Sequence, residues 1–275
     1  MFVDEAVITA SKYHDFLRVT LPYTMRQVKR IVVVTSDQEF DDPTRDLCRE
    51  YSIKCISTGL FYHRGAKFAK GKAINKGLDQ CHKRGWTLHL DADIVLPEQT
   101  SRMLATLDLD KQAIYGVDRV LVPNALAWKQ HIDKAIPQHR WSSIIETPPE
   151  FPFMARYVHE TEGYCPIGFF QLFHGDSRRT ARDFRYPEDG NEATHTDVQF
   201  SLLWDRHKRH LIPEIIAYHL DSCSAPIGAN WTGRVTPEFS MNAKSVPSKD
   251  GIKSYYDKSS NSDINPNASV QNGYQ

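Results

Sequence analysis

Short apolar runs alternate with helical patterns along the first half of the chain. The four apolar runs are residues 6–9, 31–35, 53–57 and 86–90. Runs of this length without a polar face are typical of strands buried on both sides in a parallel sheet. Residues 16–28 and 71–82 instead repeat apolar side chains with the 3.6-residue period of an amphipathic helix. The alternation predicts an α/β fold, with a mostly parallel sheet and helices on both of its faces.

Local signals refine the limits of these elements. Ser11 stands where it can cap the first helix, and Pro22 predicts a kink or a restart within that helix. A polar loop at residues 36–43 leads into a shorter helix through Leu47. Helical residues are thus expected between each pair of successive strands.

The pattern is less regular after Pro97. Residues 113–117 and 163–173 predict further strands, and residues 197–207 predict a helix. Residues 124–150, rich in Trp, His and Pro, predict an excursion over the surface of the protein.

The last part of the chain has a different composition. From about Phe239 it is dominated by Ser, Asn, Lys, Asp and Pro, with few aliphatic residues to offset the entropy of ordering. We therefore expect one folded domain at residues 1–236, followed by a polar and loosely docked tail at residues 237–275.

Composition narrows the class of protein. The chain has 275 residues, 40% of them hydrophobic, which is enough for a large core. Lys and Arg number 34, as do Asp and Glu, so no charge excess indicates nucleic acid or an anionic membrane. The five cysteines are odd in number and lack Cys-x-x-Cys spacing, which favours reduced thiols. Without a leader pattern or a long apolar window, we expect a cytoplasmic protein that does not span a membrane.

Two aspartates at the end of an apolar strand are the clearest chemical signal. Asp91 and Asp93 follow residues 86–90, and on an extended chain residues i and i+2 project to the same face. Carboxylate oxygens in that arrangement suit Mn²⁺ or Mg²⁺, with the remaining ligands supplied by a diphosphate. The alternative is a solvated turn, in which Asp is also common.

Lys70 and Gly71 stand at the start of the helix predicted just before this strand. Free backbone N–H groups and the helix dipole favour an anion there, and a lysine adds charge that can neutralise a diphosphate. Lys72 and Lys76 are better explained as solvated side chains on the outer face of the same helix.

The order and spacing of five motifs resemble nucleotide-sugar-dependent glycosyltransferases of the GT-A fold, nearest to the family 2-like and galactosyltransferase-like groups. The resemblance covers roughly residues 5–222. The motifs are Val7-Ile-Thr9, Val33-Val-Thr-Ser-Asp37, Phe68-Ala-Lys-Gly-Lys-Ala-Ile-Asn-Lys-Gly77, Leu90-Asp-Ala-Asp-Ile-Val-Leu-Pro97 and Thr196-Asp-Val-Gln-Phe200 followed by His219-Leu220. It implies a Rossmann-like sheet that binds the nucleotide at the carboxyl ends of its leading strands.

The resemblance also implies roles for single residues around the donor. Thr9 and Asp37 would border the base and the ribose, and Asn75 matches an asparagine that lies near the nucleotide. Lys70 and Asp91 would face the diphosphate. His219 would join Asp91 and Asp93 as the third metal ligand, although a lone histidine after an apolar strand is more often a packed core residue.

Asp197 matches the acidic base of inverting GT-A families. Such a base deprotonates the acceptor hydroxyl as it attacks the anomeric carbon. The usual Glu-Asp doublet is replaced here by Thr196-Asp197, so the base and the stereochemistry stay open, with Glu192 and His195 as the next candidates.

We therefore expect a metal-dependent glycosyltransferase that moves a sugar from a nucleoside diphosphate, with UDP favoured, to a hydroxyl acceptor with inversion. The acceptor is open: a saccharide, a protein, a lipid head group or a hydroxylated base in DNA. The alternatives are a nucleotidyltransferase, a phosphotransferase and a non-catalytic module that binds nucleotide sugars. A phosphotransferase usually has Asp-x-Asp-x-Thr, whereas position 95 is Val, and no N-terminal Gly-rich loop supports nucleotidyl transfer.

Overall fold

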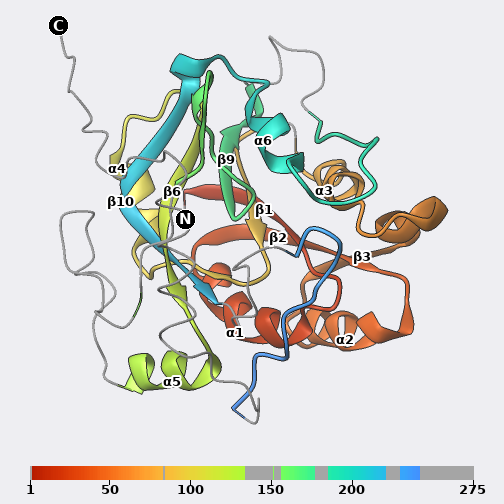
Figure 1. Ribbon diagram of the computed structural model, residues 1–275. Coiled ribbons are helices and arrows are strands. Elements are labelled where there is room, and N and C mark those ends of the chain that lie inside the picture. The colour runs from red at the N-terminus through yellow and green to blue at the C-terminus, as the bar shows by residue number, and fades with distance from the viewer. Residues whose placement is uncertain are drawn as a thin grey trace, which may run out of the picture.

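A computed structural model describes residues 2–82, 84–133, 151, 156–176, 185–220 and 230–241. An eight-stranded sheet forms its centre, in the order β3-β2-β1-β4-β9-β6-β10-β5 (Figure 1). Its strands are β1 Val3–Thr9, β2 Val28–Ser36, β3 Lys54–Thr58, β4 Trp86–Asp91, β5 Ile94–Val95, β6 Ile114–Val122, β9 Phe170–His174 and β10 Arg209–Leu220. A separate pair joins β7 Val158–His159 to β8 Gly163–Tyr164.

The first four strands of the chain, β1 to β4, run parallel to one another. β1 lies between β2 and β4, and β3 continues the sheet beyond β2. β9 is antiparallel to both β4 and β6, and β10 returns parallel to β6. The parallel strands send their carboxyl ends to one edge, and the predicted α/β fold is confirmed.

Helices cover both faces of the sheet because the strands are apolar on both sides. The helices are α1 His14–Met25, α2 Asp42–Glu50, α3 Lys70–Leu78, α4 Thr100–Thr106, α5 Ala125–Asp133 and α6 Thr196–Ser201. On β1, Ile8 packs in one core cluster with Phe16 of α1, whereas Val7 packs in the other with Ile74 of α3 and Phe200 of α6. Figure 1 shows α1 and α2 on one side of the strands and α3 and α6 on the other. No helix in the described ranges is long and apolar enough to cross a membrane.

Several predicted limits were wrong. The first helix ends at Met25, and Val28, whose side chain is buried in the core, begins β2. Pro22 lies inside α1 without ending it. Ser11 does not cap α1, since its hydroxyl donates to Asp41 at 2.8 Å.

The second half differs more from the expected elements. The strand predicted at 163–173 is divided into β8 and β9, and the helix predicted at 197–207 ends at Ser201. Residues 125–133 form α5, a helix at the surface that buries Trp128 and His131 and leaves Leu126 and Ile132 exposed. Residues 134–150 lie outside the described residues.

The segment at residues 230–241 packs against the first helix. Phe239 is buried, and its ring stacks on Phe16 with centroids 5.0 Å apart. Phe239, which lies in the part assigned to the tail, therefore contacts α1, while residues 242–275 lie outside the described residues.

Candidate active site

The predicted site residues gather where β1, β2 and β4 end. Thr9 and Asp91 are the last residues of β1 and β4, and they are partners in the register of those two strands. The hydroxyl oxygen of Thr9 is buried and has no hydrogen-bond partner among the described residues. The carboxyl edge of a parallel sheet, next to the start of a helix, is the usual place for a ligand in α/β proteins.

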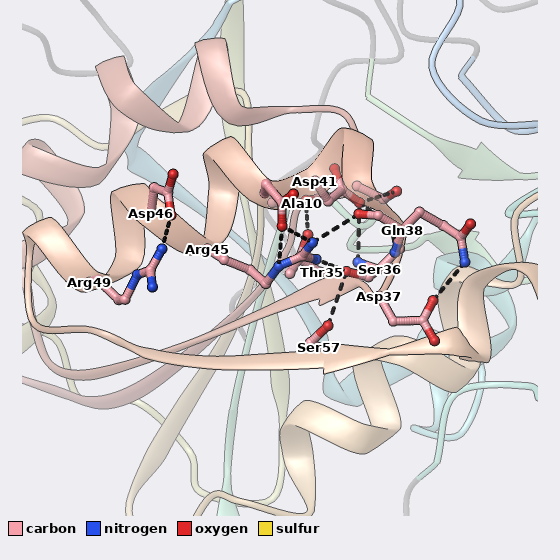
Figure 2. A network of polar contacts seen from close by, with 12 residues as sticks. Ala10, Thr35, Ser36, Asp37, Gln38, Asp41, Arg45, Asp46, Arg49 and Ser57 are labelled. Carbon is pink, nitrogen blue, oxygen red and sulfur yellow. Dashed lines mark hydrogen bonds and ion pairs between the residues drawn. The ribbon is translucent and has the colours of Figure 1, made fainter.

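Asp41 fixes the two loops that follow β1 and β2. Its buried carboxylate accepts hydrogen bonds from the Ser11 hydroxyl at 2.8 Å, the Lys12 backbone N–H at 2.6 Å and the Ser36 hydroxyl at 2.5 Å. Figure 2 shows this group, with Arg45 donating to the carbonyl of Ser36 at 2.5 Å. Sequence analysis missed Asp41, because the two serines are distant from each other in the chain.

Asp37 lies on the exposed rim of the same loop. A Cβ at Gly59 would lie 3.0 Å from its Oδ2 atom, so the carboxylate rests on the chain just after β3. Its other oxygen accepts a hydrogen bond from the Gln38 side chain at 2.8 Å. A carboxylate so exposed is free to accept hydrogen bonds from a bound molecule.

Lys70 and Asp91 form an ion pair at the centre of the site. The Lys70 Nζ atom, on the first residue of α3, is 2.5 Å from Asp91 Oδ1. Burial alone would lower the pKa of Lys70, but the negative charges of Asp91, Asp197 and Asp93 raise it above its ordinary value. The ammonium therefore stays charged and is surrounded by three carboxylates.

Asp93 contacts a different partner. β4 ends at Asp91, so Asp93 lies beyond the extended strand on which we expected the two side chains to converge. Its Oδ2 atom is 3.4 Å from Nε2 of His219, on β10. Burial would raise the pKa of Asp93, but the charge of His219 and its hydrogen bond lower it.

A divalent cation fits these side chains. The Oδ1 atom of Asp93 is buried and has no hydrogen-bond partner within the described part of the chain. An unpartnered carboxylate oxygen suits Mn²⁺ or Mg²⁺, and the imidazole nitrogen beside it is more compatible with Mn²⁺ than with Mg²⁺. No group of three His, Cys, Asp or Glu side chains is preassembled for a metal in the described residues, and Asp91 is paired with Lys70.

Asp197 is held by the backbone at the start of α6. Its Oδ2 atom accepts the Gly168 N–H at 2.6 Å, and its Oδ1 atom accepts the Val198 N–H at 2.9 Å. The side chain is half-buried, and its negative charge acts on the ammonium of Lys70. On the loop before α6, Glu192 accepts from the Thr194 hydroxyl at 2.6 Å, and His195 is exposed with a φ of 56°.

A buried polar layer lies under these acids and was also missed from the sequence. Gln171 of β9 donates to the carbonyl of Asp197 at 3.0 Å, and its own carbonyl accepts from the Tyr186 hydroxyl at 2.6 Å. His89 lies beside both and has its pKa lowered to about 3, first by burial and then by the charge of Lys70. The polar residues His89 and Gln171 within otherwise apolar strands could have indicated this layer from the sequence.

Asn75 is held by residues 186–188, next to this polar layer. Its side-chain amide donates to the Tyr186 carbonyl at 2.9 Å and to Glu188 Oε1 at 2.7 Å, and it accepts the Tyr186 N–H at 2.9 Å. These contacts join α3 to residues 186–188.

Comparison with known proteins identifies the family. The profile of glycosyl transferase family 2 matches residues 7–174. The S. aureus TarS 1–349 structure has a TM-score of 0.53 at 14% identity, and the same fragment in complex with UDP has a TM-score of 0.54 at 14% identity. Each alignment covers 79% of this chain and 60% of the TarS fragment, so the chain spans less than two thirds of that fragment. No curated protein sequence gives a significant match. By its sequence profile, the chain belongs to glycosyl transferase family 2.

Proposed function

We propose that this chain transfers a sugar from a nucleoside diphosphate, with UDP favoured, to a hydroxyl group of an acceptor, and that the anomeric configuration is inverted. One observation carries the proposal. A carboxylate held by two backbone N–H groups, that of Asp197, acts electrostatically on the ammonium of the Lys70–Asp91 pair. The side chains proposed to act on the donor, Lys70 and Asp91, are therefore adjacent to the side chain proposed to act on the acceptor, Asp197.

The donor side of the site is formed by the strand ends. Thr9 and Asp37 border the base and the ribose, because Thr9 ends β1 and Asp37 follows β2, and the loops after these strands are held together by Asp41. Lys70 binds the diphosphate as a mobile ammonium on a four-carbon stem. UDP is favoured because the TarS fragment of the same fold has been solved with UDP.

Asp93 and His219 would hold a divalent ion, with Asp91 as the further ligand. Two carboxylates suit Mn²⁺ or Mg²⁺, and an imidazole ligand is more compatible with Mn²⁺ than with Mg²⁺. The bound ion would stabilise the charge that accumulates on the leaving diphosphate.

Asp197 is proposed as the base. Hydrogen bonds from Gly168 and Val198 orient its carboxylate, and each oxygen keeps a lone pair that can accept the proton of the acceptor hydroxyl. Asp118, Arg156 and Tyr164 help to line a small hollow beside Gly168, and Asp118 and Arg156 are paired with each other at 2.7 Å. The acceptor proposed for this base is a compound with free hydroxyl groups, either a saccharide or a hydroxylated base in DNA.

The donor half of the proposal is tested by hydrolysis of nucleotide sugars. A panel of UDP-sugars and other nucleotide sugars is incubated with the protein, with Mn²⁺, Mg²⁺ or EDTA. We expect release of UDP that depends on the metal and is lost in Asp93→Asn, whereas Asp108→Asn, an exposed acid beyond α4, turns over normally. An Asp93→Asn protein with wild-type turnover in EDTA would remove the metal from the proposal.

A further inference from the structure

The ammonium of Lys70 occupies the part of the site where negative charge is concentrated. Its Nζ atom lies 2.5 Å from Asp91 Oδ1, and the side chains of Lys70 and Asp91 are only 18% and 26% exposed. The carboxylates of Asp93 and Asp197 act on the same ammonium electrostatically. The ammonium of Lys70 therefore already neutralises the carboxylate of Asp91, which would be the third ligand of a metal ion.

A divalent ion and this ammonium need the same carboxylate. Asp91 Oδ1 is engaged by Lys70, and no three-ligand group is preassembled in the ranges that the structure describes. Asp93, in contrast, keeps a buried oxygen without a partner. Two positive charges at one carboxylate repel each other strongly in a partly buried site. A divalent cation that binds without a nucleotide therefore finds Asp93 and His219 available, while Asp91 is paired with Lys70.

Only the side chain of Lys70 can move away. Its backbone starts α3, and a Cβ at the next residue, Gly71, would lie 2.1 Å from the carbonyl oxygen of Pro187, so the helix is in close contact with that segment. The lysine side chain is flexible, and its position at a helix start places it where a phosphate would bind. A diphosphate thus offers Lys70 a second anionic partner.

We propose that Lys70 and a divalent cation compete for Asp91, so that the cation binds tightly only after a diphosphate has drawn Lys70 away. The inference rests on the proposed donor site. It makes binding of the nucleotide and the metal cooperative, because each removes an obstacle to the other.

The test measures binding of Mn²⁺ and UDP to the whole chain by calorimetry and by the Mn²⁺ electron paramagnetic resonance signal. Without UDP, Lys70→Met should bind Mn²⁺ more tightly than the wild type by roughly 5-fold or more, the lower end of usual coupling between sites. UDP should strengthen Mn²⁺ binding in the wild type and do so less in Lys70→Met. Lys70→Arg, which keeps the charge, and Lys76→Met, exposed on the same helix, should both resemble the wild type.

Three outcomes would overturn the inference. Equal Mn²⁺ affinity of the wild type and Lys70→Met without UDP would show that no competition exists. Tight Mn²⁺ binding by Lys70→Arg would show that the charge is not the cause. If the wild type binds Mn²⁺ neither alone nor with UDP, the metal-dependent function fails together with the inference, whereas the first two results leave that function intact.

Discussion

Backbone hydrogen bonds decide which acidic residues are held in one position. Asp41 and Asp197 each accept N–H groups from residues before or after a strand or helix, and so each has a fixed orientation. Asp37 lies exposed on the rim, and among the described residues its carboxylate accepts a hydrogen bond from the Gln38 side chain and none from the backbone. The difference fits a structural role for Asp41, a base for Asp197 and a ligand contact for Asp37.

Asp197→Asn tests the base directly. We expect transfer to an acceptor to fall by roughly 10²- to 10⁴-fold, the range for general-base catalysis, because an amide cannot take the proton. UDP and Mn²⁺ binding should be nearly unchanged. The measurement needs a real acceptor and an analysis of the anomeric product, with Asp189→Asn, an exposed acid before the same helix, as the control. A retained configuration, or normal transfer by the Asn variant, would move the assignment to Glu192 or His195.

At the scale of elements, α3 is set directly on the sheet. Its apolar stripe was readable from the sequence, and Ala73, Ile74 and Leu78 are all buried. How close the helix approaches was not readable. A Cβ at Gly77 would lie 2.4 Å from Val7 Cγ1 and 2.9 Å from Val34 Cγ2, so only glycine allows this separation.

Gly77→Ala should therefore have two opposite effects on stability, a gain in helix propensity and a loss from overpacking. Alanine favours the helix by about 1 kcal/mol relative to glycine. Overpacking a filled core costs about 1–3 kcal/mol, and here the obstructing atoms belong to two β-branched side chains of the central strands. We expect a net loss of free energy of unfolding in urea titrations, and no loss in Lys76→Ala, which is exposed one residue away. A Gly77→Ala protein more stable than the wild type would show that the sheet yields to the added methyl group.

At the scale of the whole molecule, residues 230–241 join parts that are far apart in the chain. The Trp231 carbonyl accepts the N–H of Ala193, on the loop before α6, and Arg234 pairs with Asp15 of α1. Figure 1 shows this blue segment passing from that loop toward α1. Burial would raise the pKa of Asp15, but the hydrogen bond and charge of Arg234 lower it below its ordinary value.

The sign of the pH dependence follows from the lowered pKa of Asp15. The pair stabilises the fold fully above the unfolded pKa, about 3.9, and its contribution is lost as the pH falls through the lower folded value. Because the Asp15 and Arg234 side chains are 5% and 8% exposed, Arg234→Met leaves a buried charge and should cost roughly 3–5 kcal/mol at pH 7.

Urea titrations at pH 7 and at pH 3.5 measure this cost. The difference between the wild type and Arg234→Met should shrink at the lower pH. Arg18→Met is the matched control, because its pair with Glu50 also involves α1 but is exposed, and it should lose only about 0–1 kcal/mol. Equal losses for the two variants at pH 7 would contradict a structural role for the buried pair.

Local sequence patterns were sufficient to predict the fold class and most of the leading elements. Strands buried on both faces and helices with one apolar stripe produce periods that are visible within ten residues or so. The Asp91 and Asp93 motif could also be predicted from the local sequence, because both residues lie at the end of one apolar strand. Prediction was weaker after Pro97, where β8 and β9 divide one apolar run and α6 ends early.

The hydrogen bonds and ion pairs between polar side chains could be identified only from the tertiary structure. Ser11 with Asp41, Lys70 with Asp91, Asp93 with His219 and Gly168 with Asp197 are pairs separated along the chain by many residues. A hydrogen bond between distant residues leaves no periodic pattern, because its geometry depends on strand order and on how closely helices approach the sheet. Local sequence therefore determines which elements form, and the packing of those elements determines the chemistry of the site.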